Sequence, residues 1–220
     1  MEKIKILIIN PNSDEAMTRA IQENAARYAG ERLFVHTLST PGASPFVATY
    51  RDHALAVPGM VQLYRENEDQ YDAVIVACHA DPNLDLMKEI AEKPVVGISE
   101  ASMKMATMLG HSFSVVAPGE RGIPNKWALI DKYGLRRFAA SVRPALGEGD
   151  DALIEAGRRA VEEDGAEVLV LGCAGFAGLD KKMQATLGVP VLDGVICALI
   201  TAEGLVRAGL SISKKLRYKK

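Results

Sequence analysis

Short aliphatic runs alternate along the chain with amphipathic stretches. The runs contain few polar residues, as is typical of parallel strands covered on both faces. The stretches between them repeat apolar residues at helical spacing. The pattern predicts an α/β fold built from βαβ units. Strands are expected at Lys3–Ile9, Leu33–Leu38, Ala73–Ala77, Pro94–Ile98, Ser112–Val116, Arg137–Val142, Val168–Leu171 and from Pro190; helices are expected at Glu15–Ala29, Arg51–Glu68, Leu84–Ala91, Glu100–Leu109, Pro124–Tyr133, Asp150–Asp164, after Cys173 and at Gly194–Ala208.

Two parts of the chain have similar sequences. Asp72–Asp85 reads DAVIVACHADPNLD and Glu167–Asp180 reads EVLVLGCAGFAGLD. Each has an acidic residue, an aliphatic strand, a cysteine at the strand end and Leu-Asp at the same distance beyond it. The earlier segments Ile6–Asn12 (ILIINPN) and Phe113–Gly119 (FSVVAPG) also align. The second half therefore repeats the element order of the first, which predicts two similar lobes with right-handed crossovers.

The repeat also predicts domain boundaries. We expect residues 1–98 with 195–220 to form the first lobe and residues 99–194 to form the second. Such halves commonly pack about a pseudo-twofold axis. In that arrangement Cys78 and Cys173 occupy equivalent places on facing lobes, at the carboxyl edges of the sheets, where α/β enzymes place their chemistry.

Composition narrows the possible functions. The chain has 220 residues and a formal net charge of −2, which gives no support for nucleic-acid binding. No apolar run approaches the roughly 20 residues of a membrane span, and the opening MEKIKILIIN enters a strand without a signal-peptide cleavage site. Three cysteines do not suggest a disulfide framework, so a cytoplasmic location is expected. The basic tail Lys214–Lys220 is interpreted as a solvated end. At the other end of the chain, Ser13 is expected to be the N-cap of the first helix.

Two cysteines at matching points of a repeat suggest acid–base chemistry. Removing a proton next to a carbonyl needs a base on the C–H, and inversion needs an acid on the opposite face. Cysteine suits both roles because its pKa lies near neutrality and a helix N-terminus lowers it. The small residues Gly172, Ala174 and Gly175 let a substrate approach and are expected to leave backbone N–H groups free for an enolate oxygen.

Other readings of these residues are less well supported. A redox pair lacks a Cys-x-x-Cys motif, and a zinc site needs more ligands than His79, the one candidate near either cysteine. Cys197 lies in an apolar helix and is expected in the core. The glycine loop has neither GxGxxG nor the P-loop lysine. Support for nucleotide binding is therefore weak, and no metal site is expected.

Together the motifs resemble the aspartate/glutamate/hydantoin racemase superfamily, in its hydantoin and allantoin racemase branch. The resemblance covers almost the whole chain. It rests on INPNS (Ile9–Ser13) followed by Met17-Thr18, and on ACHADPNLD (Ala77–Asp85), PVVGISEASM (Pro94–Met103), GCAGFAGL (Gly172–Leu179) and GVPVLDGV (Gly188–Val195).

This resemblance implies two Rossmann-like lobes with the site in the cleft between them, no cofactor, and two-base proton transfer. Cys78 and Cys173 become the paired acid/base residues. The residues implied to bind substrate are Asn10 and Asn12 in one turn, Ala117 and Pro118 in another, and His79, Ala80, Ala174 and Gly175 directly after the cysteines.

The chain also departs from its relatives. Hydantoin racemases commonly have Phe where His79 stands and Thr-Thr where Ala117-Pro118 stand, whereas glutamate racemases place polar residues after both cysteines. The small followers in this chain fit a neutral ring better than a charged amino acid. The predicted function is racemisation of a 5-substituted hydantoin or allantoin-like ring by a homo-oligomer. An amino-acid racemase, a maleate-type isomerase and a binding protein without turnover remain the alternatives.

Overall fold

A computed structural model describes residues 3–176 and 178–219 and contains two four-stranded parallel sheets. The strands are β1 Ile4–Asn10, β2 Leu33–Ser39, β3 Ala73–Val76, β4 Val95–Gly97, β5 Phe113–Ala117, β6 Ala139–Pro144, β7 Val168–Leu171 and β8 Val191–Leu192. The α-helices are α1 Glu15–Ala29, α2 Tyr50–Asn67, α3 Leu84–Ile90, α4 Ile98–Leu109, α5 Ile123–Lys132, α6 Gly149–Glu162, α7 Leu179–Leu187 and α8 Gly194–Arg207.

The described residues form two compact units. The first contains the residues up to Ile98 and those from Ala198 onward, and the second is Ser99–Cys197. Strand order is β2-β1-β3-β4 in the first unit and β6-β5-β7-β8 in the second. If the four strands of each unit are numbered from one to four along the chain, both sheets have the order 2-1-3-4. The α/β repeat expected from the sequence is therefore confirmed. In both units the strand that precedes the cysteine, β3 or β7, lies inside the sheet between two neighbours.

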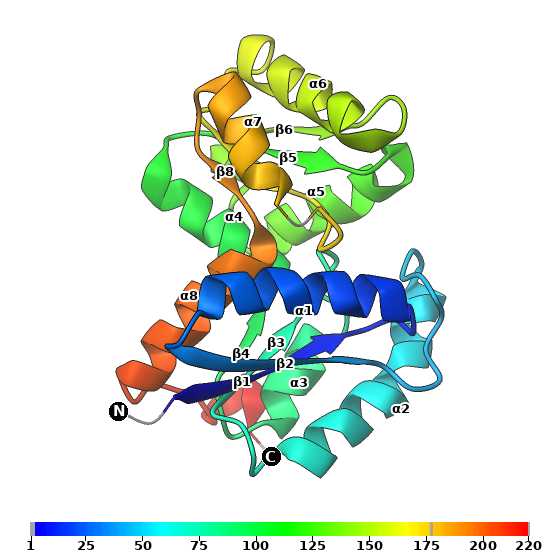
Figure 1. Cartoon of the computed structure of the whole chain (residues 1–220), viewed down its shortest axis with the longest axis vertical. Helices are drawn as coiled ribbons and strands as arrows, with labels where there is room; N and C mark the ends of the chain where they lie inside the picture. The colour runs from blue at the N-terminus through cyan, green and yellow to red at the C-terminus, as the bar shows by residue number, and fades with distance from the viewer. Residues whose placement is uncertain (1–2, 177, 220) are drawn as a thin grey trace. The chain divides into compact units, whose positions relative to one another are not determined.

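In the first unit, helices cover both faces of the sheet. Alternate residues of β1 and β3, among them Leu7, Ile9 and Val76, pack against Met60 of α2 and Met87 of α3. Figure 1 shows α1 on the opposite side of this sheet from α2 and α3. A sheet covered on both faces has no polar side on its central strands, which explains why their sequences lack alternation.

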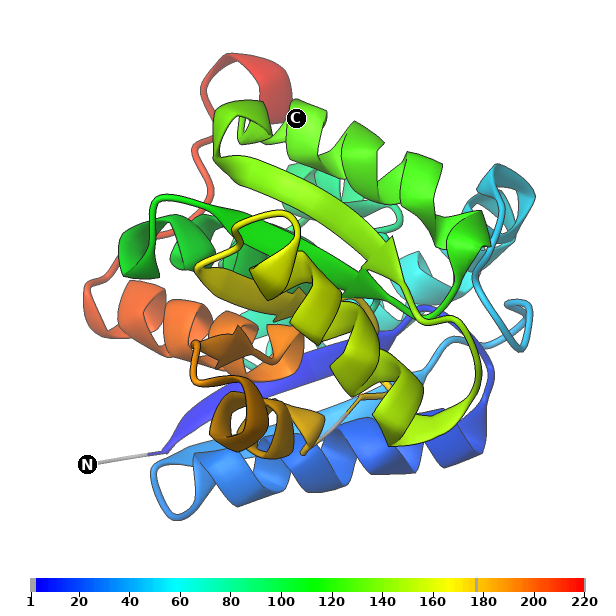
Figure 2. The ribbon, with the colours of Figure 1, turned by 90° about the horizontal axis from the view of Figure 1, so that it is seen from above.

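The second unit has the same layering. Leu169 and Leu171 of β7 pack against α6 and α7 around Met183. Val168 and Val170 face the other way and pack against Ile130 of α5 and residues of α4. Seen from above, β6 is the edge strand between α5 and α6 (Figure 2).

Local signals in the sequence predict most element ends to within one or two residues. Helix α1 spans Glu15–Ala29 and ends at Gly30, which has a positive φ of 53°, as predicted. The predicted cap at Ser13 is wrong, because Asp14 accepts hydrogen bonds from the backbone N–H groups of Ala16 and Met17.

The basic tail is largely exposed but contacts the first unit. Lys214 Nζ donates to the backbone oxygens of Lys88 and Glu89, at 2.8 and 2.9 Å. The hydroxyl of Tyr218 donates to Asp85 Oδ1 at 2.7 Å. The tail therefore packs on α3, the helix after Cys78, and is not simply a solvated end. Across the described residues, no helix has the length and apolar character needed to cross a membrane.

Candidate active site

Cys78 follows the central strand of the first unit. The backbone N–H of Ala77 donates to the carbonyl of Ile9 at 2.9 Å, which holds the end of β3 beside the end of β1. Asn10 is the last residue of β1, so the sheet brings Asn10 and Cys78 to the same edge. After the cysteine, the N–H of Asp81 donates to the Cys78 carbonyl at 2.9 Å and closes a turn before α3. The Cys78 residue is partly exposed.

Asn10 is fully buried and held by its amide group. Its Nδ2 donates to Asn12 Oδ1 at 2.7 Å and to Thr18 Oγ1 at 2.9 Å. Its backbone oxygen accepts from the hydroxyl of Thr40 at 2.7 Å. The side-chain oxygen Oδ1 has no hydrogen-bond partner within the described part of the chain. A buried amide oxygen without a donor is costly in a protein that binds nothing there.

The other predicted residues of the first unit differ in exposure. Asn12 and His79 are buried, with relative exposures of 4% and 2%. Asn12 Oδ1 also accepts from the backbone N–H of Asp14 at 3.0 Å, which fixes the turn after β1. Ala80 is partly exposed. These residues share the carboxyl edge of the first sheet.

Cys173 follows the central strand of the second unit. The N–H of Gly172 donates to the carbonyl of Val116 at 2.8 Å, the counterpart of the Ala77–Ile9 bond. This bond holds the cysteine loop beside Ala117, the last residue of β5. A Cβ on Gly172 would lie 2.6 Å from the Val116 oxygen, so the approach requires glycine. Among the other predicted residues here, Ala117 and Ala174 are buried, whereas Pro118 and Gly175 are exposed.

The environment of the Cys173 thiol opposes its ionisation. The residue keeps some exposed surface, but its thiol is largely withdrawn from water, and this burial raises the pKa. Two groups act in the opposite direction and lower the pKa. The backbone N–H of Gly175 donates to Sγ at 3.4 Å, and Lys126 contributes a positive charge.

Two expectations about this loop need correction. The N–H groups of Gly172 and Gly175 are not free for a substrate oxygen, because they bond to Val116 and to the cysteine sulfur. Burial has the largest effect on the pKa of Cys173 and raises it, whereas the sequence pattern predicts a lowered pKa. The thiol therefore depends on specific neighbours to become a thiolate.

The two cysteine turns share one backbone feature. The residue at the start of each following helix is left-handed: Asn83 has φ 58° and ψ 18°, and Gly178 has φ 82° and ψ −6°. Each lies at the same distance beyond its cysteine in the sequence. Glycine and asparagine are the residues that adopt this conformation most readily. The repeat therefore extends from sequence to backbone dihedral angles.

Sequence reasoning missed three residues near these edges. Thr18 and Thr40 form the hydrogen bonds with Asn10 given above. Thr18 belongs to the Met17-Thr18 pair after the INPNS motif but was given no role in the site, and nothing in the local sequence marks Thr40. Lys126 did leave a signal, because it interrupts the apolar face of α5 between Ile123 and Ile130. No cluster of metal-binding side chains occurs among residues 3–176 and 178–219. Cys197 is buried, as expected, with a relative exposure of 2%.

Comparisons with known proteins agree with this architecture. The family model described as Asp/Glu/Hydantoin racemase matches residues 6–202. A hydantoin racemase of Pseudomonas sp. (strain NS671) is 36% identical over 98% of this chain and 91% of its own length. The structure of allantoin racemase from Klebsiella pneumoniae superimposes with a TM-score of 0.93 at 33% identity, over 98% of this chain and 93% of that one.

Allantoin racemase from Pseudomonas fluorescens gives the same TM-score of 0.93 and 33% identity, over 98% of this chain and 96% of its own. These matches span both units, so they cover the two cysteine turns together. The chain therefore belongs to the Asp/Glu/hydantoin racemase family, as an isomerase of the racemase type.

Proposed function

We propose that this protein racemises 5-substituted hydantoins or allantoin-like rings at C5, with Cys78 and Cys173 as the two acid/base groups. The substrate class comes from the hydantoin and allantoin racemases to which the chain is similar. The observation that carries the proposal is the duplicated cysteine turn. In each unit a cysteine follows the central strand, an N–H bond fastens the preceding residue to the neighbouring strand, and a left-handed residue starts the next helix.

The duplication supports a reaction that runs in both directions. The thiolate of one cysteine takes the C5 proton, forming an S–H bond while the C–H electron pair moves onto a carbonyl oxygen of the ring. The thiol of the other cysteine then gives its proton to the opposite face of C5, and the enolate pair returns to carbon. The protonation states of the two cysteines are then reversed. In this state the enzyme can take the C5 proton from the opposite enantiomer. The two thiols supply both proton transfers, and we propose no cofactor.

Residues beside the cysteines support a neutral ring as substrate. Ala174 and Gly175 follow Cys173 and offer no side-chain charge for the ammonium or carboxylate of a free amino acid. Ring ureides instead carry N–H groups that need acceptors. We propose that Asn10 Oδ1, the buried oxygen described above, accepts such a hydrogen bond. Asn12, His79, Ala80, Ala117 and Pro118 are proposed to line the same site.

Solvent-proton exchange tests the proposal directly. Single enantiomers of 5-substituted hydantoins, allantoin, aspartate and glutamate are incubated with the protein in deuterated water with a metal chelator. Proton NMR follows loss of the C5 or α proton against an enzyme-free blank, because hydantoins exchange slowly by themselves. We expect protein-dependent loss for a ring compound, together with loss of optical rotation.

Other outcomes would redirect the proposal. Exchange with an amino acid alone would keep the two-base chemistry and contradict the ring substrate. No exchange with any compound would refute racemisation and favour a maleate-type isomerase or a binding protein without turnover. Maleate consumption and ligand binding by calorimetry separate those last two readings.

A further inference from the structure

The loop between β2 and α2, residues 40–49, begins beside the turn that carries Asn10 and Asn12. The hydroxyl of Thr40 donates to the Asn10 carbonyl at 2.7 Å, and the Thr40 N–H donates to the Asn12 carbonyl at 2.9 Å. Thr40 itself is fully buried. Because β1 and β2 are parallel neighbours, the loop and the Asn10 turn leave the sheet at the same edge.

One carboxylate holds the rest of the loop. Asp52, in the first turn of α2, accepts hydrogen bonds from the hydroxyls of Ser44 and Thr49, both at 2.8 Å. It also accepts from the backbone N–H groups of Ala48 and Thr49, at 3.1 and 2.8 Å. The Ser44 carbonyl accepts in turn from the N–H of Ser13 at 3.1 Å. The segment between Ser44 and Ala48 is therefore fixed at both ends by the same side chain.

This fixed segment exposes apolar side chains. Phe46 has a relative exposure of 56%, and its neighbours Pro45 and Ala48 are exposed as well. Val47 is buried and anchors the segment from below. Single exposed apolar side chains are ordinary, whereas a group of them is typical of a binding surface. We call Pro45, Phe46 and Ala48 the apolar patch.

The polar groups of the loop are engaged elsewhere. Its hydroxyls belong to Thr40, Ser44 and Thr49, and each donates to a backbone oxygen or to Asp52. Residues 40–49 contain no charged side chain. A strongly polar group placed against the patch would lose its hydrogen bonds to water without gaining a side-chain donor from the loop. An alkyl or aryl group would instead bury apolar area there.

The strand order places the loop close to the proposed substrate-binding residues of the first unit. Strand β1 lies between β2 and β3, so the loop, the Asn10 turn and the Cys78 turn follow three adjacent strands. Adjacent strands are about 4.8 Å apart, so the row spans roughly 10 Å. This is comparable to the length of a hydantoin ring with a benzyl group. A ring with C5 at Cys78 and an N–H at Asn10 can therefore extend its substituent toward the loop.

We propose that Phe46 is a specificity-determining residue that contacts the C5 substituent, so that the preferred substrates are hydantoins with an alkyl or aryl group at C5. The proposal rests on the proposed racemase function and deepens it, because allantoin carries a polar ureido group at C5. Asp52 and Ser44 hold the loop in place and do not touch the substrate. Phe46 supplies the apolar surface that the substituent covers.

Calorimetric titration with three ligands tests the proposal. The ligands are 5-benzylhydantoin, 5-methylhydantoin and allantoin, each as the racemate, so that turnover causes no net reaction. We expect the parent protein to bind 5-benzylhydantoin about tenfold more tightly than 5-methylhydantoin, because more apolar area is buried. Phe46→Ala should reduce this ratio by about three- to tenfold, mainly by weakening the binding of 5-benzylhydantoin.

Three further variants separate the chemistry of Phe46 from a general effect of substitution. Phe46→Leu keeps an apolar side chain and should give an intermediate ratio. Phe46→Gln supplies an amide and should lower the preference for 5-benzylhydantoin over allantoin. Phe34→Ala is the matched control, because Phe34 is 50% exposed but lies near the opposite end of β2. It should leave all three affinities unchanged.

The outcomes distinguish this proposal from the racemase function. An unchanged benzyl-to-methyl ratio in Phe46→Ala overturns the role of Phe46, whatever the exchange assay shows, and so does tighter binding of allantoin than of 5-benzylhydantoin by the parent. A reduced ratio in a protein that exchanges no C5 proton supports the contact and refutes racemisation. Absence of binding by all three ligands overturns the contact together with the ring substrate class. If both proposals hold, kcat/KM of Phe46→Ala for 5-benzylhydantoin falls by the same factor as its affinity.

Discussion

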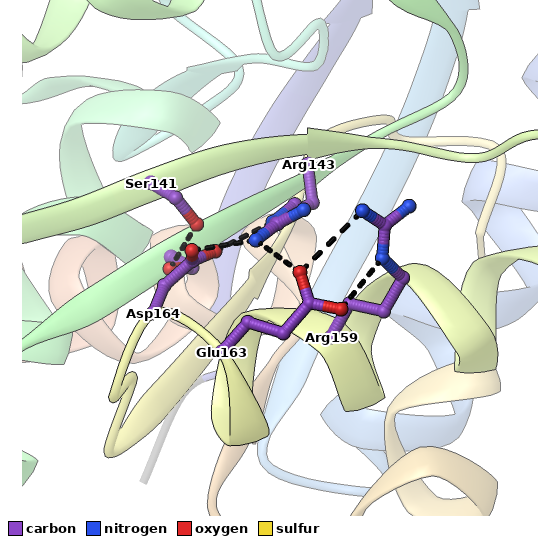
Figure 3. Close-up of polar contacts among 6 residues, drawn as sticks. Ser141, Arg143, Arg159, Glu163 and Asp164 are labelled. Carbon is purple, nitrogen blue, oxygen red and sulfur yellow. Dashed lines mark hydrogen bonds and ion pairs between the residues drawn. The ribbon is translucent and has the colours of Figure 1, made fainter.

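The carboxylate of Asp164 accepts two hydrogen bonds from the guanidinium of Arg143, both 2.6 Å long (Figure 3). Arg143 lies on the edge strand β6, and Asp164 follows the end of α6. Ser141 and Glu163 belong to the same polar cluster (Figure 3). The bidentate pair therefore fastens the end of a helix to the edge of the second sheet.

Asp164→Asn should destabilise the protein in a pH-dependent way. The hydrogen bond from Arg143 lowers the pKa of Asp164 below its ordinary value. A lowered pKa means that the stabilisation is present above the unfolded-state pKa, about 3.9, and is lost as pH falls further. We expect the variant to lose about 1 kcal/mol at pH 7, because a charge-assisted bond becomes a neutral one in a partly solvated site.

Urea unfolding of the parent and the variant at several pH values provides the measurement. The gap in unfolding free energy should close below about pH 4. Glu163→Gln is the matched control: its side chain is half exposed, so its loss should be smaller. A difference in unfolding free energy that stays constant from neutral to acid pH would show that the charge of Asp164 does not stabilise the contact with Arg143.

Cys78→Ser and Cys173→Ser should each abolish racemisation, because each removes one of the two proposed proton carriers. A serine hydroxyl is far less acidic than a thiol and is a poor base at neutral pH. One variant is expected to retain proton exchange with a single enantiomer, through the cysteine that remains. Polarimetry follows racemisation, and NMR in deuterated water follows exchange. Full racemase activity in both variants would refute the two-base mechanism.

Asn10→Ala should raise KM for the ring substrate by about three- to tenfold, as expected for the loss of one hydrogen bond of about 1 kcal/mol. Thr37→Val is a useful control. The Thr37 hydroxyl is the other buried side-chain oxygen without a partner among the described residues, but it lies within β2, two residues before the strand end. Its replacement should leave KM unchanged. Equal effects of both changes on KM would mean that the Asn10 oxygen has no special role.

Gly172→Ala should impair both stability and turnover. The new Cβ would lie 2.6 Å from the Val116 oxygen, which cannot retreat without breaking its bond to the Gly172 N–H. We expect a loss of about 1–3 kcal/mol in unfolding free energy and a lower kcat, because the cysteine loop is displaced. Gly204→Ala on α8 meets no atom within 4 Å and should instead be neutral or stabilising by about 0.5–1 kcal/mol. Thermal melts and kinetics on both variants check the contrast.

Cys197 should be chemically inert in the folded protein. Burial first, and the carboxylates of Asp193 and Asp180 second, raise its pKa to about 12. The group therefore stays protonated and unreactive at neutral and mildly alkaline pH. Iodoacetamide should label Cys197 only after urea is added, as read by peptide mass spectrometry, and Cys197→Ser should retain activity. Rapid native labelling of this residue would contradict the burial described here.

Sequence patterns predicted the core of the fold because burial determines where apolar residues occur in each strand and helix. The strand Val168–Leu171 was predicted with its observed bounds, since a parallel strand inside two helical layers has no polar side. Helix α1 was predicted equally well, because Gly30 marks its end. The choice of cap failed because Ser13 and Asp14 are both capping types, and only the path of the turn decides between them.

Other features depend on contacts between distant parts of the chain. The tail reaches α3 mostly through backbone oxygens, and no side-chain pattern reveals such partners. Lys126 interrupts an apolar helix face, and only the packing of α5 on the sheet shows that this lysine is buried. The orientation of the Asn10 amide likewise depends on the fold. Its Nδ2 donates to Asn12 Oδ1 and Thr18 Oγ1, and this leaves Oδ1 without a partner among the described residues.

The contact between the tail and α3 has a consequence for biosynthesis. Lys214 and Tyr218 leave the ribosome after the whole of the second unit, yet they bind the helix that follows Cys78. The second unit is continuous in sequence, so the nascent chain can complete the turn around Cys173 first. The turn around Cys78 acquires its last stabilising contacts only when the tail has emerged. During translation the two cysteine turns therefore gain their final contacts at different times, and a stalled chain would have completed only the turn around Cys173.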